Sequence, residues 1–225
     1  KELIENSIDA GSKKIEIHIE DSGIKNILIK DDGFGMSKSD LDMAFHRHTT
    51  SKISSKDDLF SIKTLGFRGE ALPSIASVSF LSAVSNNKNS IHQIKITGGK
   101  KDFLKKGALN SGTVIKVENL FFNLPARKKF LKSQKHEFNK ITLVVKSYAL
   151  SYPAIAFKFT HNSKEIYDLE VGSLEDRICN IFGGKTKDSL IPVNFEQDDC
   201  TISGFAGNID LLRKRKTNQF IFLNN

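Results

Sequence analysis

Three side chains near the start of the chain have the types and spacing that water activation and metal binding require. Glu2, Asn6 and Asp9 are four and three residues apart, so a helix places them on one face. A carboxylate beside a carboxamide suits a water-activating base next to a ligand for Mg²⁺, which prefers oxygen ligands and keeps several waters. Taken alone, however, the same spacing fits the solvated face of an amphipathic helix, which is the more common case.

A second candidate site follows a strand-like segment. Asp31 ends an apolar run, and Gly33 and Gly35 after it let the backbone approach a ligand closely. A carboxylate at a strand end can accept a hydrogen bond from an exocyclic amine, and the hydroxyl of Thr113, at the start of a later strand, can also bond a ligand. A plain turn explains Asp31 to Gly35 equally well, and the dinucleotide fingerprint is excluded because the third glycine and the following helix are wrong.

A third candidate, for an anion, precedes an expected helix. Gly66 and Gly69 flank Phe67 and Arg68, and free amides at a helix start attract anions. Lys52, in the preceding loop, can also reach a phosphate. The ordinary alternative is a helix entry with a solvated arginine and lysine.

The periodicity of the chain predicts alternating helices and strands, which is an α/β class. The long loop from His46 to Gly69 has poor periodicity, and such a loop is usually functional or mobile. Ser37 or Ser39 is the expected cap of the second helix. Helices are expected at 1–10, 39–45, 70–77, 137–150 and 174–182, and strands at 14–20, 27–31, 78–84, 93–97, 113–118, 155–159, 190–195, 201–206 and 219–223.

Composition narrows the class of protein without selecting a function. The 225 residues are 39% hydrophobic, which is enough to bury a substantial core, and the formal net charge of +8 favours polyanionic partners. Cys179 and Cys200 are far apart and have no metal-binding spacing, so a reducing cytoplasmic setting is expected. No apolar run has the length of a membrane helix. The chain begins in what reads as the middle of a helix and stops directly after the strand-like run at 219–223, so we expect it to be cut at both ends.

Together the motifs resemble the nucleotide site of the GHKL ATPase superfamily, and within it the bacterial branch of the MutL-type DNA mismatch repair family. The superfamily resemblance rests on Glu2-x-x-x-Asn6-x-x-Asp9-Ala10, Asp31-x-Gly33-x-Gly35, Gly66 to Ala71 and Gly112-Thr113. The MutL resemblance rests on Arg47 to Ile53, Gly66 to Leu72 and Asn119 to Leu131. It covers nearly the whole chain and outweighs the ordinary interpretation of each separate motif.

The resemblance implies a role for each matched residue. Glu2 corresponds to the general base and Asn6 to the magnesium ligand. Asp31 corresponds to the carboxylate that reads the adenine amine. The other expected contacts to ATP are Asp9, Gly33, Gly35, Lys52, Gly66, Phe67, Arg68, Gly69 and Thr113. Asp32 departs from the family, which often has Asn there, and we expect little effect because Asp31 is the reader.

The resemblance also implies a GHKL/Bergerat ATP-binding fold, an α+β two-layer sandwich with a mixed sheet, over residues 1–172. Residues 173–225 are expected to begin a second α/β domain of the transducer type. ATP and magnesium are the implied cofactors, and ATP is expected to order the lid at 46–69 and to join two chains as a homodimer. The implied partners are a mismatch-recognition protein, a downstream repair nuclease or helicase, and DNA, which would be contacted mainly through its phosphates.

Family members also have an N-terminal segment before Glu2 and a late lysine that reaches the γ-phosphate, and this chain has neither. We therefore expect weak nucleotide binding and poor hydrolysis by the chain as it stands.

Two other functions remain open from the sequence. A DNA-binding module without relevant ATPase activity would use basic runs, although a solvated face explains such runs more often. A different GHKL enzyme, such as a topoisomerase subunit, is disfavoured by the MutL-type motifs. The basic runs comprise Arg127, Lys128, Lys129, Lys132 and Lys135, and Arg213, Lys214, Arg215 and Lys216.

Overall fold

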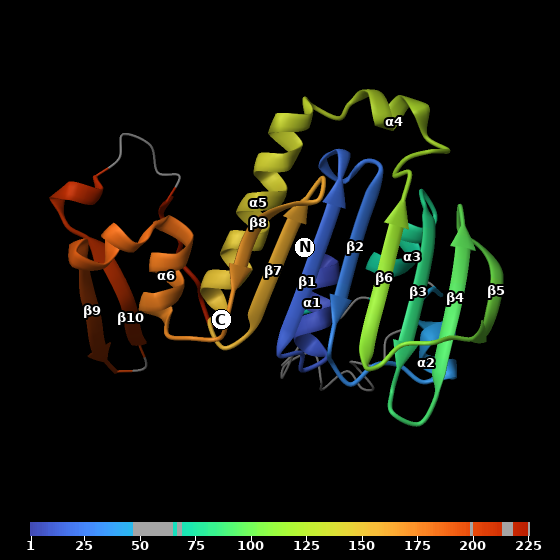
Figure 1. Ribbon diagram of the computed structural model, residues 1–225, viewed down its shortest axis with the longest axis horizontal. Coiled ribbons are helices and arrows are strands. Elements are labelled where there is room, and N and C mark those ends of the chain that lie inside the picture. The colour runs from blue at the N-terminus through green and yellow to red at the C-terminus, as the bar shows by residue number, and fades with distance from the viewer. Residues whose placement is uncertain (47–64, 67–68, 199, 213–217, 225) are drawn as a thin grey trace.

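A computed structural model describes residues 1–46, 65–66, 69–198, 200–212 and 218–224 (Figure 1). Its largest feature is an eight-stranded mixed sheet in the order β5-β4-β3-β6-β2-β1-β7-β8. The pair β1–β7 is parallel and every other neighbouring pair is antiparallel. The strands are β1 (Lys14–Glu20), β2 (Asn26–Asp31), β3 (Phe80–Asn86), β4 (Ile91–Thr97), β5 (Lys100–Lys106), β6 (Gly112–Glu118), β7 (Ala156–His161) and β8 (Lys164–Leu169).

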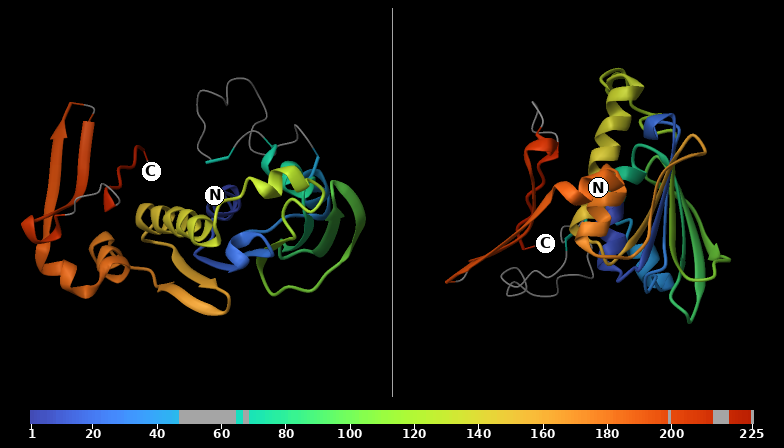
Figure 2. Two further views of the ribbon diagram at one scale, coloured as in Figure 1. Left: turned by 90° about the horizontal axis from the view of Figure 1, so that it is seen from above. Right: turned by 60° about the vertical axis from the view of Figure 1, so that its left-hand side comes forward.

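Helices cover one face of this sheet (Figures 1 and 2). They are α1 (Glu2–Asp9), α2 (Lys38–Met43), α3 (Ala71–Ala76) and α5 (Gln134–Ser151). Alternation along β1 explains the layering, because Ile15, Ile17 and Ile19 are buried in the core that the helices share. The opposite face carries cross-strand charge pairs, including Glu16 with Lys30 at 3.2 Å. Such a face is stable in water, so the domain has two layers rather than three.

The C-terminal part contains a second, smaller sheet. Helix α6 (Leu174–Phe182) packs against α5 and β8, and it is followed by β9 (Leu190–Gln197) and β10 (Cys200–Gly207), which form a two-stranded antiparallel sheet. The Arg177 side chain of α6 is 1% exposed and donates to the carbonyl oxygens of Ala149, Pro153, Ile155 and Glu170 at 2.9–3.0 Å. This buried guanidinium joins α6 to the loop and helix before it.

Most expected elements are confirmed, including the β1–β2 hairpin, α6 and the cap of α2, which is Ser37 in a capping box with Asp40. The sequence interpretation missed β5, β8 and the short helix α4 (Pro125–Lys129). The strand expected at 219–223 is wrong. Ile221 is 95% exposed and Leu223 is 88% exposed, and no described strand pairs with this segment. Apolar alternation alone does not make a strand without a hydrogen-bonded partner.

Within the described part of the chain, no helix combines the length and the apolar character needed to cross a lipid bilayer.

Candidate active site

Helix α1 presents the first group of candidate residues. Leu3 and Ile4 are 7% and 2% exposed and anchor the helix in the core. The side chain of Glu2 is 49% exposed, whereas Asn6 and Asp9 are half-buried. The expected helical face therefore forms, with a carboxylate at its solvent end and a carboxamide one turn further.

Glu5 lies off this face, as its spacing predicts, and it has a different environment. It is 6% exposed, and the Tyr148 hydroxyl of α5 donates to its Oε1 atom at 2.6 Å. The Lys1 ammonium lies 3.4 Å from the same oxygen. Burial, and then the bond to Glu5, raise the pKa of Tyr148, so the phenol remains a donor. The sequence analysis did not identify Tyr148 as a site residue. The only indication in the sequence was a hydroxyl-bearing side chain on the apolar face of a helix.

Asp31, at the end of β2, is a buried carboxylate of the candidate site. It is 7% exposed and accepts three hydrogen bonds. The amides of Gly33 and Thr113 donate to Oδ1 at 3.0 and 3.2 Å, and the Ser7 hydroxyl of α1 donates to Oδ2 at 3.0 Å. Burial raises the pKa of Asp31 and outweighs the lowering by these donors. The result is a preoriented carboxylate that can accept one more donor from a ligand.

Asp32, the neighbour of Asp31, makes different contacts. Its Oδ1 atom accepts from the backbone amides of Lys13 and Lys14 at 2.8 and 2.9 Å, so it shapes the connection between α1 and β1. Asp32 is exposed, in contrast to Asp31. Because Asp32 and Asp31 have different partners, the contacts of Asp31 do not depend on the side chain of Asp32. This supports the expectation that an aspartate at position 32 has little effect on Asp31.

The glycines after Asp31 are required by contacts within the protein itself. A Cβ atom on Gly33 would lie 2.7 Å from Ala10 Cβ, at the end of α1. Gly35 has φ +69°, and a Cβ there would lie 2.1 Å from the carbonyl oxygen of Asn86. Both glycines are therefore needed for packing against the end of α1 and against β3, and their close approach to a ligand stays a prediction.

Thr113 supports the site from β6. Its Oγ1 atom is 2.8 Å from Ser85 Oγ, which in turn accepts from the Met36 amide at 2.7 Å. Both hydroxyl side chains are buried. Sequence reasoning missed Ser85, because one serine in a strand carries no signal of its own.

The start of the anion motif contacts α1. The amides of Leu65 and Gly66 donate to the two carboxylate oxygens of Asp9 at 2.9 and 3.2 Å. Gly69 has φ +63° just before α3, a backbone conformation that glycine adopts readily. The structure thus brings the first and third motifs together. Lys52, Phe67, Arg68 and most of the expected lid at 46–69 lie outside the described residues.

The donor set of α1 fits a magnesium ion. Asn6 offers a carboxamide oxygen on the face that also carries Glu2, the candidate base, and Mg²⁺ commonly uses one or two protein oxygens together with water and phosphate. Among the described residues, no group of three or more His, Cys, Asp or Glu side chains could hold a metal by itself.

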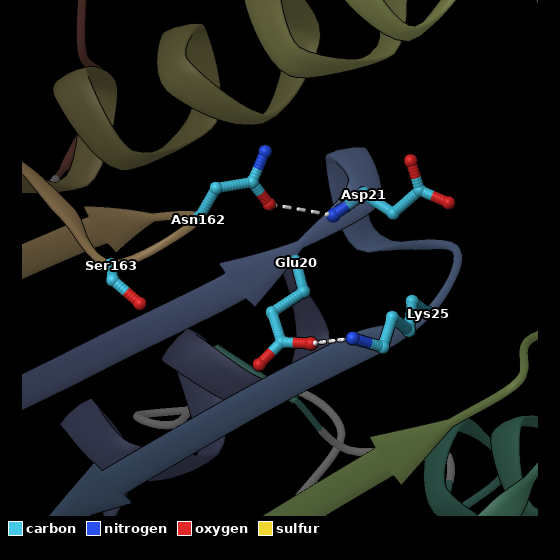
Figure 3. A pocket seen from close by; sticks show the side chains of 5 residues that line it. All are labelled: Glu20, Asp21, Lys25, Asn162 and Ser163. Carbon is cyan, nitrogen blue, oxygen red and sulfur yellow. Dashed lines mark hydrogen bonds and ion pairs between the residues drawn. The ribbon is translucent and has the colours of Figure 1, made fainter.

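A shallow pocket lies elsewhere, at the far end of β1 (Figure 3). Glu20 and Lys25 form an ion pair at 2.8 Å there, and Asn162 Oδ1 accepts from the Asp21 amide at 3.0 Å. Strand β1 runs from the Asp32 side to Glu20, a length of roughly 20 Å. The pocket contains none of the candidate residues, and four of its five lining residues already pair with one another.

Comparisons with known proteins agree with this geometry. Residues 1–118 match the family described as histidine kinase-, DNA gyrase B- and HSP90-like ATPase. The DNA mismatch repair protein MutL of Parabacteroides distasonis is 42% identical over 226 residues, covering 100% of this chain and 37% of that protein. The chain thus spans little more than a third of that relative's length.

Two solved structures share the fold. The ATPase domain of Aquifex aeolicus MutL, complexed with ADP, has a TM-score of 0.67 and 29% identity over 86% of this chain and 69% of that one. The N-terminal domain of a DNA repair protein has a TM-score of 0.80 and 27% identity over 97% of this chain and 69% of that one. The chain therefore belongs to the histidine kinase-, DNA gyrase B- and HSP90-like ATPase family, and it matches the MutL branch of that family along its whole length.

Proposed function

We propose that this chain is the ATP-binding and hydrolysing region of an ATP-switched DNA mismatch repair protein. The observation that carries the proposal is Asp31, a buried carboxylate oriented by Ser7, Gly33 and Thr113. An acceptor of this kind matches the exocyclic amine of adenine. The Aquifex aeolicus relative in complex with ADP supports an adenine nucleotide as the ligand.

Helix α1 supplies the chemistry in this proposal. Glu2 accepts the proton of the attacking water, and its exposure gives that water access. Asn6 would hold magnesium, which would neutralise phosphate charge there. Asp9 contacts the start of the phosphate-binding motif through Leu65 and Gly66. Lys52, Phe67, Arg68 and Gly69 are proposed to contact the phosphates by resemblance to the family.

The remaining partners follow from the relatives. Nucleotide binding is proposed to order the lid, join two chains and expose surfaces for a mismatch-recognition protein and a downstream nuclease or helicase. Residues 1–172 would form the ATP-binding domain and residues 173–225 the start of a transducer-type domain, in a cytoplasmic protein. Contact with DNA would be phosphate-directed, and basic side chains on and after α4 are exposed. These are Arg127, Lys128, Lys129, Lys132 and Lys135.

Competition between nucleotides tests the proposal. Guanine has a carbonyl where adenine has its amine, and a carbonyl facing the Asp31 carboxylate is repelled. In the full-length protein with magnesium, ATP should displace a labelled adenine nucleotide far better than GTP does. Equal displacement by GTP would overturn the assignment of Asp31. A protein that binds DNA but no adenine nucleotide would favour the alternative of a DNA-binding module without ATPase activity.

A further inference from the structure

The contact between α1 and α5 contains a directional hydrogen bond that the site description leaves without a role in the reaction. Tyr148 donates to Glu5 Oε1 at 2.6 Å, and the carboxylate is 6% exposed. Glu5 lies immediately before Asn6 and less than one turn after Glu2 on the same helix. A constraint on Glu5 is therefore a constraint on both of these side chains.

The other contacts of α1 explain why this bond matters. Leu3 and Ile4 hold the helix to the core through apolar burial, which has no preferred direction. Ser7 and Asp9 make directional hydrogen bonds further along the helix, and the bond through Glu5 adds one near the end that carries Glu2. Rotation of a helix about its axis preserves much of such burial, yet it moves every side chain on the polar face. A hydrogen bond between a phenol and a carboxylate is short and directional, and it opposes that rotation.

The partner helix is itself held firmly at this point. Ala149, the residue after Tyr148, is 0% exposed, and its carbonyl oxygen accepts from the Arg177 guanidinium at 2.9 Å. Tyr148 therefore projects from a turn of α5 that is fixed by the core and by α6. The phenol is anchored on the α5 side and ends on the carboxylate of α1.

We propose that Tyr148 is a positioning residue for ATP hydrolysis. Through Glu5, it sets the orientation of α1, and hence the places of Glu2 and Asn6 relative to the nucleotide. This inference rests on the proposed function. A rotation of α1 should affect Glu2 and Asn6 more than Asp31, because two of the three donors to Asp31, the amides of Gly33 and Thr113, lie outside α1, and only Ser7 lies on it.

Tyr148→Phe in the full-length protein tests the inference, because it removes the hydroxyl and keeps the ring. We expect kcat to fall roughly 10- to 100-fold, since small misplacements of reacting groups cost about that much. The magnesium concentration for half-maximal activity should rise through Asn6, while adenosine affinity stays within about 2-fold. Tyr167→Phe is the matched control, because its ring packs against Phe159 in the same core.

Glu5→Gln provides an independent variant that keeps an acceptor oxygen. It should lose less turnover than Tyr148→Phe, and the double variant should be no worse than Tyr148→Phe alone, because both changes act on one bond. Additive losses would overturn the inference. So would a Tyr148→Phe protein whose kcat falls only in proportion to its folded fraction, with unchanged magnesium dependence.

The inference and the proposed function fail in different ways. If the wild-type protein hydrolyses ATP and Tyr148→Phe does so equally well, only the positioning role is refuted. If the wild-type protein neither binds adenosine nor hydrolyses ATP, the proposed function fails and takes the positioning role with it.

Discussion

Asp31→Asn separates recognition of the nucleotide from stability of the fold. The carboxamide oxygen can replace Oδ1 and accept from the amides of Gly33 and Thr113. The new amide group would occupy the Oδ2 position and donate to Ser7 Oγ. The Ser7 hydroxyl would then donate to the carbonyl oxygen of Leu3 alone, which lies 3.2 Å away. The fold should therefore survive with a change in unfolding free energy of about 1 kcal/mol or less.

Binding should suffer far more than stability. The variant presents an N–H donor where the adenine amine also donates, so a charge-assisted bond is lost and two donors face each other. The combined loss is about 2–4 kcal/mol, which corresponds to a roughly 30- to 1,000-fold weaker affinity. Asp31→Ala is a poorer test, because it leaves the buried amides of Gly33 and Thr113 without their acceptor, at about 1–3 kcal/mol each.

Titration calorimetry with adenosine, together with urea unfolding of the same samples, measures both quantities. Asp32→Asn is the matched control, because the same chemical change at an exposed neighbour should leave adenosine affinity unaltered. A folded Asp31→Asn protein that binds adenosine within about 3-fold of the wild type would refute the role of Asp31.

Further predictions concern catalysis, pH and the C-terminal part. Glu2→Ala should keep ATP binding and lower turnover by roughly 10²- to 10⁴-fold, and near-normal turnover would exclude Glu2 as the base. Because burial raises the pKa of Asp31, adenosine affinity should be full above that raised pKa and fall as the pH decreases through it. The stability of the free protein should depend on pH in the opposite direction. The stabilisation linked to Asp31 is present below the ordinary pKa of an aspartate and is lost as the pH rises through the raised pKa of Asp31. Asp31→Asn should abolish both pH dependences in binding and urea titrations. Arg177→Met should lower the unfolding free energy by about 3–5 kcal/mol, because buried carbonyls lose their donor, whereas exposed Arg127→Met should change it by less than about 0.5 kcal/mol in urea unfolding.

Local sequence determined the elements that present the chemistry. Helical spacing placed Glu2, Asn6 and Asp9 on one face, because a helix turns by a constant angle per residue. Strict alternation from Lys14 to Glu20 determined β1. The sequence narrowed the cap of α2 to Ser37 or Ser39, and the capping box forms at Ser37 with Asp40. These features depend only on residues close together in the chain.

Strands β5 and β8 show where such local reasoning stops. Strand β5 is lysine-rich and lies at the sheet edge, beyond β4, where charged side chains remain in water. Its alternation is therefore weak, and the pairing with β4 defines it instead. The segment 219–223 shows the reverse, since its apolar pattern finds no partner among the strands that the structure describes.

The contacts that turn these elements into a site were decided by tertiary structure. Asp31 takes one donor from 24 residues earlier and another from 82 residues later, and Glu5 meets Tyr148 across 143 residues. A serine or tyrosine in a helix has many possible partners, and the sequence pattern does not rank them. The partner is selected by the register of the sheet and by the packing of α1 between β2 and α5, because a hydrogen bond needs its two atoms within about 3 Å and in the correct direction.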